Sequence, residues 1–267
     1  MDSQKSSKEE RRHFLYRLFA GLVFYICAPV LTAFWGGLVG LSQFIPASGP
    51  DAYSRRAHRI AGHWGKSMFS VIPGWRVEVT GWENLPADGD AVVMVANHES
   101  MVDILVMYFL EIQFRWLSKE SVFRIPVVGP AMRACGYIPI LRGDRNSHEQ
   151  ALASSAVWIK RGINMFFFAE GTRSEVPGTM RPFKIGAFKL ANENNVDVLP
   201  VAIRGAGKLW RKNGRLPDSA TVRLRVLPRT RMQEGETYEA YAARVRSVIG
   251  SAWTELGNEG NPAAPAP

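Results

Sequence analysis

The feature that most constrains the fold is a run of 27 residues near the N-terminus without a charged residue or a histidine, from Leu18 to Phe44, LFAGLVFYICAPVLTAFWGGLVGLSQF. About 20 such residues are enough for a helix to cross the hydrocarbon core of a bilayer. The average helix of a globular protein is only about half as long as this run. A buried core helix is therefore the less favoured interpretation, and we expect the segment to contact a membrane.

Two other interpretations of this run concern its processing and its path. A cleaved signal peptide is not expected, because the run is longer than the roughly 7–15 apolar residues of such peptides. Basic residues flank both ends, at positions 5, 8, 11, 12 and 17 before it and 55, 56 and 59 after it. The positive-inside bias is therefore split, and Pro29 with the glycines at 36, 37 and 40 permits a bend. A re-entrant helical pair fits at least as well as a single crossing.

The next segment, residues 53–72, mixes basic residues with large apolar residues at near-helical spacing. This pattern suits a helix lying at the membrane interface. It equally suits an amphipathic helix packed on the domain.

The net charge of +9 favours an anionic partner surface, either nucleic acid, phospholipid headgroups or a phosphorylated substrate. No stacking-aromatic motif accompanies the basic residues, so we expect no nucleic-acid partner. The two cysteines, Cys27 and Cys135, form neither a disulfide framework nor a zinc-binding spacing, which indicates a reducing environment for the main domain.

From residue 76 onward, β-rich runs alternate with helical patterns, which predicts an α/β fold with a mixed, largely parallel sheet. The predicted strands cover residues 76–80, 91–96, 114–117, 137–141, 163–168, 198–203 and 221–227. The predicted helices cover residues 101–110, 121–134, 147–160, 183–193 and 236–256. We expect three parts: a basic, membrane-embedded or interfacial helical segment (1–72), an α/β catalytic domain (73–256) and a disordered tail (257–267).

His98 follows the predicted strand at 91–96, and Asp103 follows five residues later. Ligands of open α/β sheets bind at the carboxyl ends of strands. On a helix starting near Ser100, Asp103 would face back toward His98, and a carboxylate on one ring nitrogen makes an imidazole a general base. Taken alone, the pair favours a structural interpretation, with Asp103 as a first-turn helix acid and His98 as a polar cap.

Three later segments also place polar groups at strand ends or inside strands. FFFAEGTRSE (166–175) supplies a carboxylate, a glycine, hydroxyls and an arginine, GYIPILRGDR (136–145) supplies Arg142 and Arg145, and VLPVAIRG (198–205) contains Pro200. Arginine is suited to bind phosphate. A proline inside a strand is typical of an edge strand or a special bend.

The segments NHESMVD, GYIPILR, FFFAEGTRS and VLPVAIRG, in this order, resemble the four sequence blocks of the glycerolipid acyltransferases. The specific resemblance is to the 1-acyl-sn-glycerol-3-phosphate acyltransferase (lysophosphatidic acid acyltransferase) family, and it runs from about residue 75 to 230. It implies a glycerol-3-phosphate acyltransferase-like fold, with the sheet flanked by helices and preceded by an N-terminal membrane-embedded helical segment.

The resemblance implies acyl transfer from acyl-CoA or acyl carrier protein to the sn-2 hydroxyl of lysophosphatidate, without a cofactor or metal. His98 would be the general base, Asp103 would orient it, and Lys119 would stabilise the oxyanion. The residues implied in substrate binding are Arg142, Glu170, Gly171, Thr172, Arg173 and Pro200. Pro200 would shape the acyl-donor side rather than take part in the chemistry.

The implied partners are the phospholipid bilayer, lysophosphatidate and the acyl donor, at the cytoplasmic face of a bacterial inner membrane. Three alternatives stay open. A related acyltransferase would act on glycerol 3-phosphate or another lyso-lipid. A serine hydrolase would use Ser100 or Ser121, although no G-x-S-x-G elbow is present. A non-catalytic, basic membrane-binding protein would explain the charge alone.

Overall fold

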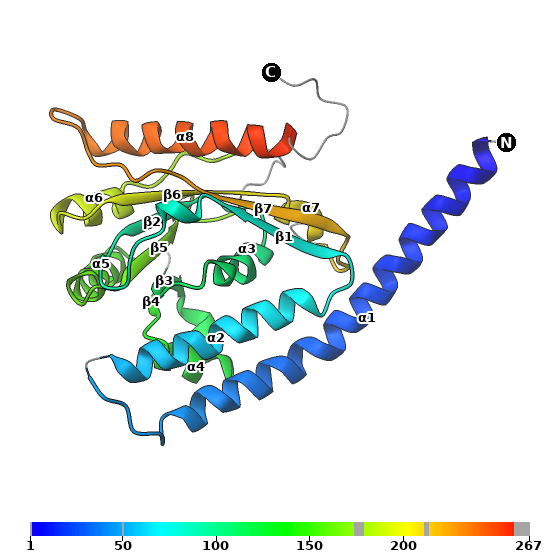
Figure 1. Cartoon of the computed structure of the whole chain (residues 1–267), viewed down its shortest axis with the longest axis horizontal. Coiled ribbons are helices and arrows are strands. Elements are labelled where there is room, and N and C mark those ends of the chain that lie inside the picture. Colours follow the sequence, from blue (N-terminus) through cyan, green and yellow to red (C-terminus); the bar gives the residue numbers. More distant parts are fainter. Residues whose placement is uncertain (1, 50, 142, 174–178, 211–213, 259–267) are drawn as a thin grey trace.

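A seven-stranded sheet forms the centre of the protein (Figure 1). The structure is a computed structural model, and it describes residues 2–49, 51–141, 143–173, 179–210 and 214–258. The strands are β1 (Trp75–Thr80), β2 (Val93–Ala96), β3 (Phe114–Lys119), β4 (Ile138–Ile140), β5 (Asn164–Phe168), β6 (Val198–Arg204) and β7 (Ala220–Val226). Each coincides with a strand predicted from the sequence to within three residues at either end.

The order of the strands in the sheet is β1-β7-β6-β2-β5-β3-β4. The five strands from β6 to β4 are parallel, whereas β7 runs antiparallel to β6 and pairs in parallel with β1. The sheet is therefore mixed and largely parallel, as the sequence predicts. The carboxyl ends of β2, β3, β4, β5 and β6 consequently lie along one edge.

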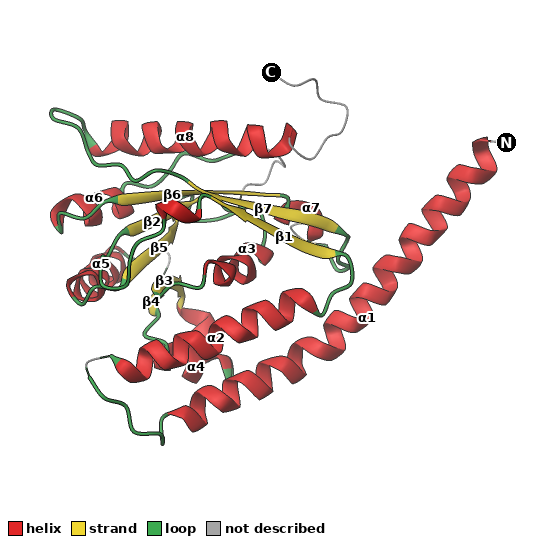
Figure 2. Ribbon diagram, viewed as in Figure 1, coloured by secondary structure: helices red, strands yellow, loops and turns green. Residues whose placement is uncertain are grey.

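Helices cover both faces of the sheet, with α8 on one side and α2 and α3 on the other (Figure 2). The α-helices are α1 (Asp2–Ser42), α2 (Ala52–Ser70), α3 (Val102–Val106), α4 (Val128–Ala134), α5 (Arg145–Lys160), α6 (Gly186–Glu193), α7 (Ala206–Leu209) and α8 (Tyr238–Asn258). Short 3₁₀ helices are η1 (Trp82–Asn84), η2 (Met107–Leu110) and η3 (Glu120–Arg124). Residues 257 and 258 thus continue α8, and residues 259–267 of the predicted tail lie outside the described part of the chain.

The packing of strand β2 explains why its sequence is apolar throughout. Val93 and Val95 pack on the side formed with α5, α6 and α8, whereas Met94 and Ala96 pack on the side of α2 and α3. All four residues are fully buried. Because successive side chains of a strand point to opposite faces, a strand covered on both faces must be apolar at every position.

Two predicted helices are shorter than expected. The segment 101–110 forms α3 and then narrows to the 3₁₀ helix η2, and the segment 121–134 is interrupted between η3 and α4. Pro126 causes this interruption, because the residue before a proline avoids the helical conformation. Ile125 accordingly has an extended backbone, and Val127 adopts a positive φ of 66° while the amide of Val128 donates to the Pro126 carbonyl (2.8 Å).

Helix α1 is continuous through Pro29, so the uncharged run does not fold into a helical pair by itself. The chain instead turns after α1 and returns along it as α2 (Figure 1). Helix α2 buries one face against the domain, including His58, Met68 and Phe69. A side chain at Gly65 would overlap Tyr108, since an added Cβ would lie 2.3 Å from that ring. The packed form of an amphipathic helix is therefore what the structure shows for α2.

The surface of α1 is apolar and largely uncovered. Segment Lys8–Ser42 is long and apolar enough to cross a bilayer, and only 11% of its most apolar window is buried inside the protein. Apolar side chains more than half exposed include Phe19, Leu22, Ile26, Val30 and Phe34. Such a continuous apolar surface on a soluble protein would be unusual, and it marks an interaction with lipid or with another protein.

Candidate active site

His98 and Asp103 meet in the turn that joins β2 to α3. The His98 Nδ1 atom lies 2.7 Å from Asp103 Oδ2, although five residues separate the two along the chain. The Asp103 side chain is fully buried, whereas that of His98 is 14% exposed. A carboxylate can only accept hydrogen bonds, so Nδ1 of the neutral ring carries the hydrogen and Nε2 is left to take a proton.

A single oxygen of Asp103 holds this turn together. Oδ2 also accepts hydrogen bonds from the backbone amides of Glu99 (2.7 Å) and Ser100 (2.8 Å). The other oxygen, Oδ1, is buried without a hydrogen-bond partner among the described residues. The geometry of the His98 ring therefore depends on one atom that receives three N–H groups.

The neighbouring strands fix the turn from both sides. The His98 ring stacks on Phe168, the last residue of β5, with centroids 3.9 Å apart and planes inclined by 16°. On the other side of β2, the amide group of Asn97 donates to the carbonyl of Ile203 in β6 and accepts from its amide, at 2.8 Å each. The position of the imidazole is thus set by packing as well as by Asp103.

Glu170 lies behind this turn and does not line the cavity beside it. Its Oε1 accepts from the His98 amide and its Oε2 from the Arg181 amide, both at 2.8 Å. The side chain is 3% exposed, and burial raises its pKa above the usual range even though the two amides oppose the shift. Both carboxylate oxygens are therefore engaged by the backbone, and the residue connects the β5 turn to the β2 turn.

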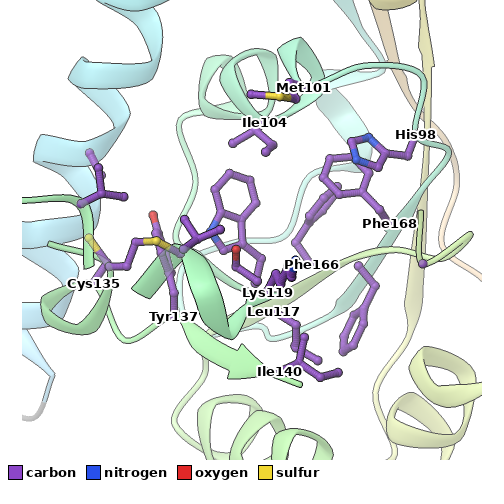
Figure 3. A pocket seen from close by; sticks show the side chains of 18 of the residues that line it. His98, Met101, Ile104, Leu117, Lys119, Cys135, Tyr137, Ile140, Phe166 and Phe168 are labelled. Atoms are coloured by element: carbon purple, nitrogen blue, oxygen red, sulfur yellow. The ribbon is translucent and has the colours of Figure 1, made fainter. Parts of the chain in front are cut away.

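A cavity of about 780 Å³ opens beside His98 and extends under the parallel strands. Its volume is within the range of roughly 300–1,000 Å³ typical of small-molecule sites. Most of its lining is apolar and comes from α1, α2, β3, α4 and β5. In Figure 3, His98 and Phe168 lie on one side, Cys135 and Tyr137 lie on the opposite side, and Leu117 and Ile140 lie between the two.

The side of the cavity far from His98 rests on buried polar groups. The hydroxyls of Tyr137 and Tyr108 are 2.8 Å apart, and Tyr137 also bonds to His58 Nδ1 (2.9 Å). Burial lowers the pKa of His58 to about 3, so its ring is neutral, and burial raises the pKa of the Cys135 thiol to about 12. These groups carry no charge at neutral pH, which keeps this end of the cavity compatible with a hydrocarbon chain.

Three cations line the same cavity: Lys119 at the end of β3, Arg173 in the turn after β5, and Lys184 before α6. None of the lining residues in the described part of the chain is an aspartate or a glutamate. No ion pair is formed by these three side chains among the described residues. Unpaired cations facing a shared space favour an anionic ligand.

Lys184 is a residue that the sequence did not reveal. Gly171 has a positive φ of 69°, and a Cβ built there would lie 2.7 Å from Cε and 3.0 Å from Nζ of Lys184. The Lys184 backbone is fixed by a hydrogen bond from its amide to the Ala169 carbonyl (2.8 Å). Glycine at 171 thus lets the lysine lie across the turn. A lysine 13 positions after this glycine gives no periodic signal in the sequence.

The other predicted site residues are distributed as follows. Gly171 and Thr172 line the cavity, whereas Arg142 lies outside the described residues. Arg145 points to solvent and pairs with Glu149 on α5, so it does not converge with the cavity cations. The structure therefore brings His98, Lys119 and the 171–173 turn to one cavity.

Pro200 is buried in β6, which lies between β7 and β2, so of the two expected settings, an edge strand or a special bend, the edge strand is wrong. The carbonyl of Pro200 accepts from the Leu227 amide (2.9 Å), on the side of β7. The amide position of a strand residue faces the same neighbour as its carbonyl. The continuous ladder between β6 and β7 begins at Val201, so Pro200, which has no N–H to return to Leu227, lies at the end of that ladder.

The serine alternatives find no support in the geometry. The Ser100 hydroxyl is fully buried and donates to the Trp210 carbonyl (2.8 Å). Ser121 lies on η3 and does not line the cavity. Neither hydroxyl has a hydrogen bond to His98 among the described residues, which a serine nucleophile would need.

Comparison with known proteins gives the same assignment from sequence and from structure. A family profile described as Acyltransferase matches residues 76–204. The chain is 38% identical to the chloroplastic 1-acyl-sn-glycerol-3-phosphate acyltransferase of Brassica napus over 60% of this chain and 46% of that protein. It is 32% identical to human 1-acyl-sn-glycerol-3-phosphate acyltransferase alpha over 70% of this chain and 67% of that protein. The matched part thus spans about half the length of the plant relatives.

The fold has a solved counterpart. The crystal structure of the 1-acyl-sn-glycerophosphate acyltransferase PlsC from Thermotoga maritima superposes with a TM-score of 0.79 at 28% identity, and the match covers 92% of this chain and 98% of that chain. A match over 92% of the chain extends well beyond residues 76–204, which the family profile matches. The chain therefore belongs to the 1-acyl-sn-glycerol-3-phosphate acyltransferase family.

Proposed function

We propose that this protein transfers an acyl chain from a thioester donor, acyl-CoA or acyl carrier protein, to the sn-2 hydroxyl of 1-acyl-sn-glycerol 3-phosphate, which gives phosphatidic acid. The observation that carries the proposal is the His98–Asp103 pair at the wall of an apolar cavity that is also lined by three cations without an ion pair among the described residues. A base, an apolar volume and an anion-binding surface are the groups that this reaction needs. The names of the relatives support the acceptor.

His98 acts as the general base in the proposed reaction. Its Nε2 takes the proton of the sn-2 hydroxyl as the hydroxyl oxygen attacks the thioester carbonyl carbon. The carbon–sulfur bond then breaks, and the same nitrogen returns the proton to the leaving thiolate, so atoms and charges balance. Asp103 holds the Nδ1–H and stabilises the imidazolium that forms in between. A thioester is already activated, so no covalent enzyme intermediate is needed.

The three cations of the cavity have two roles, one at the thioester carbonyl and one at the phosphate of the acceptor. Lys119, at the end of β3, stabilises the negative charge that develops on the carbonyl oxygen. Arg173 and Lys184 bind the phosphate of the acceptor from the turn after β5, with Gly171 and Thr172 shaping that turn. The resemblance also assigns Arg142 and Glu170 to the glycerol-phosphate end and Pro200 to the acyl-donor side. Glu170 acts there through the backbone amides that it binds.

The apolar parts of the molecule suit lipid substrates. The cavity buries acyl methylenes, each of which contributes about 0.8 kcal/mol when removed from water. Helix α1 presents its uncovered apolar surface to the bilayer in which acceptor and product reside. We place the protein at the cytoplasmic face of a bacterial inner membrane, in keeping with the basic residues at positions 8, 11, 12 and 17.

The test is acyl transfer by the purified full chain in detergent. Thiol release and labelled product are followed with acyl-CoA or acyl carrier protein as donor, and with lysophosphatidate, glycerol 3-phosphate or a phosphate-free lyso-lipid as acceptor. The proposal requires transfer to lysophosphatidate that is lost in His98→Ala while membrane association stays. Turnover of His98→Ala near that of the wild type, or hydrolysis without an acceptor, would contradict it.

A further inference from the structure

The residue that follows the proposed base, Glu99, is turned away from the cavity and does not line it. Its Oε2 accepts hydrogen bonds from the amides of Gly205 (3.0 Å) and Gly207 (3.1 Å), at the start of α7. Its Oε1 accepts from the indole N–H of Trp253 in α8. Both oxygens are therefore occupied by N–H donors, so this carboxylate is not placed to exchange protons with a substrate.

Trp253 is itself held between two groups at the carboxyl end of β6. The Arg204 guanidinium lies over its indole ring, 3.5 Å from the centroid, and Arg204 Nη1 donates to the Trp253 carbonyl (2.8 Å). The indole N–H contacts Glu99, which follows β2. The last turns of α8 are thereby fixed against the edge of the sheet where the proposed catalytic turn emerges, even though α8 covers the face opposite to α2 and α3 (Figure 2).

The backbone of Glu99 reaches the proposed catalytic pair directly. Its amide donates to Asp103 Oδ2 (2.7 Å), the same oxygen that accepts from His98 Nδ1. Asp103 Oδ1 has no partner among the described residues, so within that part of the chain this carboxylate is held only through Oδ2. A displacement of Glu99 therefore moves a donor on the one oxygen that orients the imidazole.

Burial of the Glu99 carboxylate costs desolvation free energy, and close packing alone does not require a charged group at this position. Burial raises the pKa of its carboxyl group, and the nearby charge of Asp103 raises it further, whereas the three N–H donors oppose the shift. An apolar side chain would avoid this desolvation. A buried carboxylate that binds three N–H groups from two distant segments fixes a unique backbone position instead.

We propose that Trp253, acting through Glu99, is a positioning residue for the His98–Asp103 pair, so that the C-terminal helix helps to hold the base in place. This inference rests on the proposed function, because it assigns a purpose to the orientation of His98. The inference adds to the site a residue of α8, a helix that lies outside the four sequence blocks quoted above.

The test compares two tryptophan-to-phenylalanine variants of the full chain. Trp253→Phe keeps a ring beneath Arg204 and removes the N–H that Glu99 accepts. Trp158→Phe is the matched control, because Trp158 lies on α5 with Arg115 and Arg161 over its ring and outside the cavity lining. We expect Trp253→Phe to lower kcat about tenfold, with the KM of both substrates unchanged, and the control to keep wild-type values.

Amide hydrogen exchange supplies a readout that does not depend on activity. Trp253→Phe should speed the exchange of residues 98–103 and leave the strand amides as protected as in the control. Glu99→Gln is the second variant, in case Trp253→Phe is unstable, and it should act in the same direction. Exchange and kcat in both variants equal to those of Trp158→Phe would overturn the inference. If the wild type transfers no acyl group, the proposed function fails, and the exchange comparison still decides whether Trp253 positions the turn.

Discussion

Asp103→Asn tests the His98–Asp103 pair most directly, because it removes the charge of the acid and leaves its volume almost unchanged. In the folded protein, Oδ2 accepts three N–H bonds of 2.7 to 2.8 Å, and the side chain is fully buried. Asparagine can keep these bonds only by placing its oxygen at the Oδ2 position. Its NH₂ group then takes the place of Oδ1, which has no partner among the described residues.

The expected loss has a structural part and a catalytic part. A buried donor without a partner costs about 1–3 kcal/mol of stability. The neutral amide still accepts from His98 Nδ1, but it brings no negative charge to the imidazolium that forms during proton transfer. The comparable change in a serine protease triad lowers kcat on the order of 10⁴-fold. We expect a loss of about 10³- to 10⁴-fold, which is about 4–5.5 kcal/mol of transition-state stabilisation.

The assay follows thiol release with a thiol-reactive dye at saturating lysophosphatidate, and thermal unfolding is measured on the same samples. The KM of both substrates should stay within about threefold, because Asp103 does not line the cavity. Adding Asp103→Asn to His98→Ala should lower the rate little further, since the two residues act as a unit. A folded Asp103→Asn variant whose kcat lies within about tenfold of the wild type would refute the pairing of acid and base.

Further substitutions probe the groups around the pair. Lys184→Met and Arg173→Ala should each raise the KM for lysophosphatidate about tenfold with a smaller effect on kcat. Lys189→Met is the control, because that lysine pairs with Glu193 outside the cavity. Equal KM values in the control and the test variants would contradict the assignment of Lys184 and Arg173 to the phosphate. Glu170 has a raised pKa in the folded protein, so it favours folding at low pH and loses this contribution as the pH rises through that pKa. The melting temperature of the wild type relative to that of Glu170→Gln should therefore fall between pH 4.5 and 7. A difference in melting temperature that stays constant over this range would show that the carboxyl group titrates normally. Ser100→Ala should lose about 1 kcal/mol of stability and keep its activity, whereas abolished transfer in the folded variant would revive a serine mechanism.

The sheet was predictable because its strands carry their own signal. In β2 and β5, apolar residues are continuous, and each run ends where a polar turn begins, so both the strands and the common edge of their polar ends follow from the sequence. The order of the strands did not follow. Pro200 is typical of an edge strand or a special bend, and only the strand pairing shows that it lies in an interior strand, at the end of the ladder with β7.

The N-terminal segment shows a similar limit. Length and lack of charge identified α1 as a long apolar helix, but Pro29 and the glycines do not divide it into a helical pair. Whether a proline ends a helix depends on the contacts on either side of it. Here α2 lies along α1 and supports it, and this partner is supplied by a separate segment that the local sequence does not identify.

For the site, the sequence identified the chemical groups but not their anchors. The spacing of His98 and Asp103 is local, within one turn, and could be read from the chain. Their orientation also depends on two long-range hydrogen bonds. Glu170 accepts from the His98 amide, 72 residues away along the chain, and Glu99 accepts from the Gly205 amide, 106 residues away. Two carboxylates thus link the turn to the β5 turn and to the end of β6, and neither contact leaves a periodic pattern.

These anchors change what the spacing of a histidine and an aspartate can be taken to mean. Asp103 Oδ2 accepts from the ring, and its three donors all come from residues 98 to 100, so these local hydrogen bonds could form in many contexts. In the folded protein the same turn is also held from outside, by Glu170 on the His98 amide and by Gly205, Gly207 and Trp253 on Glu99. The pair is therefore held relative to the cavity and its cations, which is the relation that proton transfer to a bound substrate requires.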